Sequence, residues 1–434
     1  MMRAVKQIAV LLTSLALTAT GLRAAPGPAD VEEMRSFVER DRAYRPEARA
    51  EARRRVARLA GLTRTPAGFE LEVARIAALA DNGHTALLPP QWASRYPRSP
   101  VRLGLFADGL YVVAATRDRQ PLLGRRVLRI NGHDWREVRS AYARYQGGEQ
   151  AFRDQFVTLF MELPDLLAAA GFGSDPDQVA YTLEASGGRP ETVTVRPALT
   201  PYEGDAAFIG RSALLDAAAM LPAERLPLYL REPAREFRLA FPEGFDGAFV
   251  QLKAVRGEDI RAFLETTLAE LRRRRPATIV VDLRFNIGGD LNLARNFMQA
   301  LPGVAQDRVY AITSGRTFSA AISSLGYLKQ AAGDRLTIVG EPVGDRLEFW
   351  AEGDIMTLPG LGAMLLYATE RHNYMTGCPE DDCHGSVRTH PIRVRSLRPD
   401  IPAALTWADF QAGRDPAMAA VATDIERRRY GRAR

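Results

Sequence analysis

The sequence predicts an α/β protein built from several parts, and three observations lead to this prediction. The chain has 434 residues, which is too many for one small domain. From residue 245 onward, strand patterns alternate with helix patterns, as in a parallel or mixed sheet covered by helices. The preceding residues 26–97 have a helical pattern, and 98–198 combine short strands with helices.

Residues 1–24 are predicted to be a signal peptide. Arg3 and Lys6 form a positive start, residues 8–17 form a short apolar run, and Leu22-Arg23-Ala24 resembles a cleavage site. We therefore expect an exported protein, periplasmic or secreted, although an uncleaved anchor is the alternative. No later stretch is apolar for long enough to span a bilayer, so we expect no transmembrane segment after signal removal.

The charge gives little indication of a partner. The formal net charge is +6, and the signal peptide carries three of these charges and no acid, which leaves the mature chain near +3. No basic stripe with interleaved aromatic residues is present, so we expect no nucleic-acid binding. The basic tail at 421–434 is expected to be a solvated chain end.

The N-terminal helical segment, 26–97, has apolar residues at helical spacing. Pro46 suits a helix start and Gly61 suits a helix end. A later helical pattern breaks at Asn82-Gly83, and His84 follows this break.

Residues 98–198 are predicted to form a compact α+β module. Asp108-Gly109 is a hairpin signal between β-rich runs, Asn131-Gly132 is a turn between a strand and a helix start, and a further hairpin pattern spans 178–199. Helical patterns fill residues 137–170. Residues 199–244 are rich in proline, alanine and arginine and are assigned as a connecting region.

The core is predicted at 245–420. We expect strands at 247–255, 277–285, 308–314 and 336–341, and helices at 260–275, 291–302 and 318–333.

Ser319 is a candidate nucleophile. It follows a predicted strand and opens a helix, where backbone N–H groups and the helix dipole favour developing negative charge. The alternative is that Ser319 only caps the helix.

The run VVDLRFNIGGD at 280–290 supplies a possible partner for Ser319. Gly288 has no Cβ, so its backbone N–H can approach a ligand, and the N–H of Ala320 can complete an oxyanion hole. The alternative is an ordinary tight turn between a strand and a helix.

Four blocks together resemble the tail-specific, or C-terminal processing, serine protease family. These blocks are VDLRFNIGGD, TFSAA, TIVGEPVGDR and RPDIPA, in this order and at this spacing. The resemblance implies a core of the crotonase/ClpP-like type, with Ser319 as nucleophile and Gly288 and Ala320 as oxyanion donors. LLGRRVLRING resembles part of the family's PDZ-like domain, a peptide-binding module.

The general base departs from the family pattern. Many members carry a lysine in the turn that here reads GEPVGDR, where Asp345 or Arg346 occupies its place. Arginine does not deprotonate in proteins, so it cannot act as a base. Lys329 lies ten residues along the helix of Ser319, about 15 Å away, and nothing recommends Lys253.

His84 is the predicted base instead. DNGHT resembles the histidine motif of the tricorn-like branch, which uses serine, histidine and an acid. Imidazole has a suitable pKa for this work near neutrality. Glu348 is the predicted acid, with Asp345 and Glu370 as alternatives; a solvated loop residue is the alternative for His84.

Cys378 and Cys383 are predicted to form a disulfide, because two nearby cysteines in an exported protein are usually bonded. Zinc binding with His372, His384 and His390 is the alternative, although the spacing matches no common finger. We expect no metal and no organic cofactor.

The sequence therefore predicts an exported serine endopeptidase that cleaves a polypeptide substrate through an acyl-enzyme on Ser319. Two alternatives remain. One is a catalytically silent relative that binds a peptide or an apolar ligand. The other is a hydrolase or acyltransferase that acts on small substrates.

Overall fold

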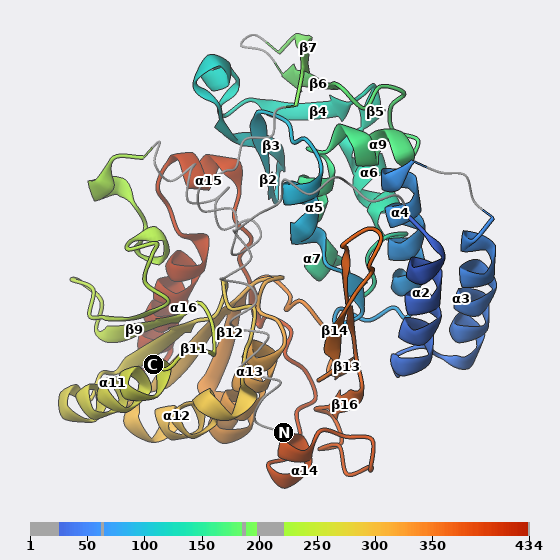
Figure 1. Cartoon of the computed structure of the whole chain (residues 1–434). Helices are drawn as coiled ribbons and strands as arrows, with labels where there is room; N and C mark the ends of the chain where they lie inside the picture. The colour runs from blue at the N-terminus through green and yellow to red at the C-terminus, as the bar shows by residue number, and fades with distance from the viewer. Residues whose placement is uncertain (1–25, 62–64, 185–187, 198–220, 433–434) are drawn as a thin grey trace. The chain divides into compact units, whose positions relative to one another are not determined.

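The structure is a computed structural model that describes residues 26–61, 65–184, 188–197 and 221–432 (Figure 1). The predicted signal peptide, 1–24, and residues 199–220 of the predicted connecting region lie outside the described residues. Within the described ranges, no helix combines the length and the apolar character needed to cross a membrane.

The chain divides into two compact units. Of the described residues, those up to 197 together with 349–370 form the first unit, and those in 221–348 and 371–432 form the second. The chain leaves the second unit through β13 (Glu348–Ala351) and returns to it through β16 (Glu370–Asn373). Nothing in the sequence pattern indicates that residues 349–370 belong with the N-terminal part.

Three helices begin the first unit, as the sequence predicts. Proline at the first turn suits each of them, because its fixed φ and missing N–H are tolerated there. Thr65 also caps the third helix by accepting a hydrogen bond from the N–H of Gly68 at 3.1 Å. The helices are α2 (Pro28–Arg40), α3 (Pro46–Leu59) and α4 (Pro66–Ala78).

The α+β module of the first unit contains an antiparallel sheet in the order β2-β3-β4-β6-β7. The predicted turns at Asp108-Gly109 and Asn131-Gly132 join paired strands. Four short helices, α6 to α9, lie between β5 and β6 in the sequence. These elements are β2 (Val101–Phe106), β3 (Gly109–Ala115), β4 (Arg126–Ile130), β5 (His133–Asp134), α6 (Trp135–Tyr142), α7 (Gln150–Arg153), α8 (Val157–Phe160), α9 (Pro164–Ala169), β6 (Val179–Glu184) and β7 (Pro190–Val195).

A second, small sheet in the first unit joins distant parts of the chain. It has the order β1-β15-β14, in which β1 (Ala86–Leu87) comes directly after the His84 loop. The other strands are β14 (Asp354–Thr357) and β15 (Met364–Tyr367). Residues 349–370, the return segment, thus contribute β14 and β15 to the sheet whose first strand comes directly after the His84 loop. Along the sequence, η1 (Pro89–Gln91) and α5 (Trp92–Arg95) lie between β1 and β2, and η2 (Arg117–Leu122) follows β3.

The second unit is built on a six-stranded mixed sheet in the order β17-β12-β11-β10-β9-β8. All neighbours are parallel except the pair β8 and β9. This result confirms the predicted alternation of strands and helices. The strands are β8 (Phe237–Ala240), β9 (Gly247–Leu252), β10 (Thr278–Asp282), β11 (Arg308–Thr313), β12 (Leu336–Gly340) and β17 (Ile401–Pro402).

Helices cover both faces of this sheet. The strands β9 to β12 follow one another in sequence and in space, so right-handed crossovers place the three intervening helices on one face. Figure 1 shows α11 (Ile260–Arg274), α12 (Leu291–Val304) and α13 (Ala320–Ala332) side by side, with α16 (Pro416–Arg432) on the other face. Shorter elements of this unit are η3 (Ala223–Arg225), η4 (Leu228–Leu230), η5 (Gly333–Arg335), α14 (Gly385–Thr389) and α15 (Trp407–Gln411).

The predicted basic tail, 421–434, continues helix α16 as far as Arg432. The sequence predicts a solvated chain end here, and Asp424 explains why a helix forms instead. Asp424 is only 2% exposed and accepts hydrogen bonds from Tyr310 on β11 and from Arg427 and Arg428. One buried carboxylate thus ties part of a basic segment to the sheet, although the overall composition of that segment suggests a solvated end.

Candidate active site

Ser319 lies in the turn between β11 and α13, at the carboxyl ends of the parallel strands of the mixed sheet. Its backbone has φ 54° and ψ −127°, a conformation that costs a non-glycine residue about 1–3 kcal/mol. The half-buried side chain makes no capping hydrogen bond to α13. In the same unit, Asp290 does cap α12 by accepting from the N–H of Asn292 at 2.9 Å. The conformation of Ser319 is therefore not explained by helix capping.

The turn before Ser319 is held by the loop after β10. The hydroxyl of Thr317 donates to the carbonyl of Leu283 at 2.9 Å, and the N–H of Phe318 donates to the carbonyl of Asn286 at 3.0 Å. Both strands end at the same edge of a parallel sheet, so their loops are neighbours. These contacts offset the cost of the Ser319 backbone and fix the serine against the following loop.

Gly288 lies directly against Ser319. It has φ 102°, and a Cβ placed there would lie 2.6 Å from the Ser319 Cβ and 2.9 Å from the backbone nitrogen of Ala320. A real Cβ cannot be accommodated at these distances, so only glycine fits. The structure therefore brings together three of the predicted site residues: Ser319, Gly288 and Ala320.

The N–H of Gly288, a predicted oxyanion donor, is already engaged in a hydrogen bond. The N–H of Gly288 donates to Oδ1 of Asn286 at 2.9 Å. Asn286 is fully buried, and its Nδ2 has no hydrogen-bond acceptor among the described residues. A buried amide N–H without a partner costs about 1–3 kcal/mol, so it requires an explanation. Asn286 is a candidate functional residue that the sequence analysis did not single out, although it stands in the quoted VDLRFNIGGD block.

A buried ion cluster supports the loop that carries Asn286 and Gly288. Arg284 donates from both terminal nitrogens to Asp415, at 3.0 and 2.9 Å, and from Nε to Asp282 at 3.0 Å. Burial raises the pKa of Asp282, and the positive charge of Arg284 opposes that rise. The geometry is bidentate, which is the most directional form of the arginine–carboxylate contact. The start of the loop is thus linked to the segment that precedes α16.

His84 belongs to the first unit, in the loop between α4 and β1. Its half-buried ring stacks on Phe349, with ring centroids 5.3 Å apart and an interplanar angle of 12°. Asn82, two residues earlier, donates to the carbonyl of Trp350 at 3.0 Å and accepts from the N–H of Trp350 at 3.2 Å. The loop is therefore fastened to the start of the return segment 349–370.

A buried carboxylate anchors the same loop on its other side. Asp41 accepts from the hydroxyl of Thr85 at 2.7 Å and from the N–H groups of Ala43 and Ala368 at 2.8 and 3.0 Å. Burial raises the pKa of Asp41, and the hydrogen bond from Thr85 is the strongest influence in the opposite direction. His84 is thus placed between two anchored neighbours, Asn82 and Thr85.

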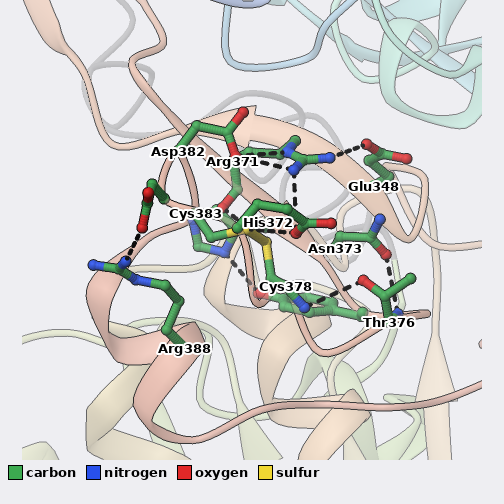
Figure 2. The surroundings of a disulfide bond; sticks show 12 residues. Glu348, Arg371, His372, Asn373, Thr376, Cys378, Asp382, Cys383 and Arg388 are labelled. Carbon is green, nitrogen blue, oxygen red and sulfur yellow. Dashed lines mark hydrogen bonds and ion pairs between the residues drawn. A yellow bond between two sulfur atoms is a disulfide. The ribbon is translucent and has the colours of Figure 1, made fainter.

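Glu348, the predicted acid, belongs to the second unit and is engaged in an ion pair. Its carboxylate accepts from Nη1 of Arg371 at 3.0 Å, and its side chain is 44% exposed. Arg371 also contacts Asp382 (Figure 2) and Glu380. Of the two alternatives, Asp345 is 6% exposed in the second unit, and Glu370 ends the return segment of the first.

Two lysines follow the predicted signal peptide, of which Lys253 is hydrogen-bonded and Lys329 is remote from Ser319. Nζ of Lys253 donates to the carbonyls of Glu232 and Pro233 at 3.3 and 3.0 Å. Lys329 lies in the last turn of α13, at the opposite end of the helix from Ser319.

Cys378 and Cys383 form a disulfide (Figure 2). Zinc binding by cysteine requires thiolates, so the alternative of a cysteine-containing zinc site does not fit the bonded pair. The neighbouring rings of His372 and His384 stack with centroids 5.4 Å apart.

The segment around the disulfide, residues 372–390, is hydrogen-bonded to α13, the helix that begins after Ser319. The hydroxyl of Tyr374 lies 2.6 Å from Oγ of Ser323 on α13 and 3.0 Å from Nδ1 of His372. The carbonyl of His390 accepts from the hydroxyl of Tyr327, also on α13, at 3.2 Å. The segment thus braces one side of α13 along two of its turns.

No family model matches this sequence, and no curated protein matches it. Among solved structures, a CPAF variant with one serine replaced by alanine matches with a TM-score of 0.53 and 11% identity over 94% of each chain. Mature CPAF complexed with lactacystin matches with a TM-score of 0.51 and 11% identity, over 94% of this chain and 95% of that one. The photosystem II D1 C-terminal processing protease covers 87% of this chain and 92% of its own at 12% identity, but its TM-score of 0.40 is too low to bear on the fold.

The chain therefore has the mixed α/β fold of CPAF along nearly its whole length. At this level of identity the likeness concerns the fold and not the chemistry, which depends on the residues around Ser319.

Proposed function

We propose that this chain is a serine peptidase of the tail-specific family, with a crotonase/ClpP-like core in the second unit. The observation that carries the proposal is the backbone of Ser319. A strained serine that does not cap its helix, held against Gly288 and the N–H of Ala320, has the arrangement of a nucleophile beside an oxyanion hole. The four sequence blocks and the fold shared with CPAF support the same family.

In the proposed reaction, Oγ of Ser319 attacks the carbonyl carbon of a peptide bond while His84 accepts the hydroxyl proton. The carbonyl oxygen becomes an oxyanion in the hole. The carbon–nitrogen bond then breaks, and the imidazolium returns its proton to the leaving amine. Water hydrolyses the resulting ester by the same sequence and releases Ser319. Glu348 is the proposed acid that orients His84, and this role would require it to exchange part of its contact with Arg371.

Asn286 completes the proposed oxyanion hole. Its Oδ1 occupies the N–H of Gly288, so its own unpaired Nδ2 is available as a donor together with the N–H of Ala320. An asparagine side chain is an effective oxyanion donor, and losing one such donor typically slows a protease about 10²–10³-fold.

Two further features are part of the proposal. Export to a periplasmic or extracellular space agrees with the disulfide between Cys378 and Cys383. The antiparallel sheet β2-β3-β4-β6-β7 is proposed as a PDZ-like module that receives a peptide by strand addition.

The test is covalent labelling by a fluorophosphonate, which reacts with activated serines. We expect labelling and hydrolysis of unfolded protein substrates by the wild type, and loss of both in Ser319→Ala. The control is Ser94→Ala, because Ser94 is exposed in the first unit and its hydroxyl only donates to the carbonyl of Gln91. Lactacystin, which is bound in one CPAF structure, serves as a second probe.

A catalytically silent binding protein is the second candidate. The hydrogen bond that occupies the Gly288 N–H favours it, since that donor is then not directed at a ligand. A correctly folded wild type that takes up neither probe would contradict the first candidate and favour this one. Turnover of small esters without cleavage of unfolded proteins would instead indicate a hydrolase for small substrates.

A further inference from the structure

A strongly cationic cavity lies at the end of α13 that is remote from Ser319. It has a volume of about 360 Å³, which is within the usual range for a small-ligand site. Four cationic side chains and one carboxylate line it. These are Lys329, Arg393, Arg395, Arg398 and Asp400.

The cations of this cavity have few local counter-charges. Among the described residues, no carboxylate forms an ion pair with Lys329, Arg395 or Arg398, whereas Arg371 in the same unit contacts three carboxylates. Oδ2 of Asp400, the one acid of the lining, accepts from the N–H of Ile338 at 2.8 Å. Like charges gathered around one cavity repel each other unless an anion is present.

The arginines stand on an anchored segment. Buried residues Ile392, Val394 and Leu397 alternate with exposed Arg393, Arg395 and Arg398, so the apolar side chains hold the backbone while the guanidinium groups face outward. That residue pattern fixes the positions from which the arginines extend.

The same segment is tied to the helix that carries Lys329. Gln330 accepts from the N–H of Arg393 at 2.7 Å and donates to the carbonyl of Pro391 at 3.2 Å. Arg393 also donates from Nε to the carbonyl of Thr376 at 3.1 Å. These hydrogen bonds hold together the helix end that carries Lys329 and the segment that carries the arginines.

We propose that this cavity binds a phosphate group with two or more negative charges, carried either by a small soluble molecule or by the headgroup of an anionic lipid. Guanidinium groups match the geometry of phosphate oxygens and lose little freedom on binding them. The formal excess of three positive charges suits a diphosphate or a phosphate monoester. The site is independent of the proposed peptidase chemistry, because it uses none of the residues around Ser319.

The test uses the full-length protein and sodium pyrophosphate in isothermal titration calorimetry at low salt. We expect saturable binding that Arg395→Glu and Arg398→Glu each weaken at least about tenfold, since each reverses one charge of the cavity. The matched control is Arg261→Glu, because Arg261 is exposed on α11 in the same unit and lies outside the cavity. Its affinity should remain within about twofold of the wild type.

Vesicle flotation then separates the two sources. Recruitment to vesicles containing phosphatidic acid, but not to phosphatidylcholine vesicles, with displacement by pyrophosphate, assigns the lipid headgroup. Binding of pyrophosphate without recruitment assigns a soluble phosphate. Absence of both kinds of binding, or equal binding by the wild type and both charge-reversed variants, overturns the proposal. Should a charge-reversed variant fail to fold, Lys329→Gln supplies the same comparison with a smaller change.

Discussion

The turn that carries Ser319 and the loop that carries His84 are held in place in different ways. The serine turn is held mainly by backbone groups of the adjacent loop, within one continuous run of strands and helices. The histidine loop is held by buried polar side chains, Asp41 and Asn82, which reach segments far away in the sequence. The first arrangement follows from local topology, whereas the second depends on particular side chains at distant positions.

This difference implies different sensitivity to substitution. Around Ser319, added bulk is the main hazard, because backbones approach closely and no Cβ fits at Gly288. Around His84, loss of a hydrogen bond is the main hazard, because a buried polar group is then left without its partner.

The largest effect is expected from His84→Ala. If the imidazole is the general base, hydrolysis falls by about 10⁴-fold or more, while the free energy of unfolding changes little. The measurement is kcat/KM on an unfolded protein substrate, together with a denaturant unfolding curve. His133→Ala is the control, because His133 is 38% exposed in the α+β module. Unchanged hydrolysis in His84→Ala would remove the histidine from the mechanism and leave the serine turn without a known base.

Gly288→Ala is expected to slow hydrolysis by about 10²–10³-fold and to destabilise the fold by about 1–3 kcal/mol. The new methyl group would press on the Cβ of Ser319, and the backbone of the new alanine would have to adopt φ 102°. Gly303→Ala is the matched control, because a Cβ there meets no atom within 4 Å and the residue is in a helix. The control should be neutral or stabilising by up to about 1 kcal/mol. Equal effects of the two substitutions would contradict the close contact described for Gly288.

Asn286→Asp is expected to lower kcat about 10²-fold with a smaller change in KM. Aspartate retains an acceptor for the Gly288 N–H but lacks the Nδ2 donor, so it separates the two roles of the side chain. Asn286→Ala should lose a similar factor in kcat and, in addition, more stability. A kcat near the wild-type value in Asn286→Asp would show that the side chain only supports the loop.

The smallest effect is expected from Thr85→Ala, at about 1–2 kcal/mol in the free energy of unfolding. Burial raises the pKa of Asp41 above its usual value of 3.8, so the stabilising contribution of this group is complete below pH 3.8 and is lost as pH rises through the raised pKa. Removing the Thr85 hydrogen bond raises that pKa further. The difference in unfolding free energy between wild type and variant should therefore be larger at pH 7 than at pH 3.

Thr116→Ala is the control for this measurement. Thr116 makes the same type of hydrogen bond, to Asp118 at 2.7 Å, but on the exposed surface. We expect a change within about 0.5 kcal/mol at both values of pH. A pH-independent difference for Thr85→Ala would contradict the role assigned to the buried carboxylate.

The contrast also explains how much could be predicted from the sequence. The strands and helices of the second unit follow from the hydrophobic pattern and the positions of glycine. The proximity of Ser319, Gly288 and Ala320 could therefore be predicted from the sequence. The membership of residues 349–370 in the first unit was not, because the contacts that hold them there, such as Asn82 with Trp350, join positions with no shared local pattern. The ion pair of Glu348 with Arg371 is likewise a contact between separate strands that no spacing rule indicates.

The bidentate ion pair between Arg284 and Asp415 determines when, during synthesis of the chain, the loop after β10 gains its support. The partners are 131 residues apart in sequence, so the loop that supports the candidate nucleophile receives this brace only after a long downstream stretch has left the ribosome and docked. Closing so large a loop is slow relative to local folding. A nascent or prematurely terminated chain lacking Asp415 would have every residue of the serine turn and yet lack this ion pair, so the proposed hydrolytic activity would be delayed until synthesis of the chain is nearly finished.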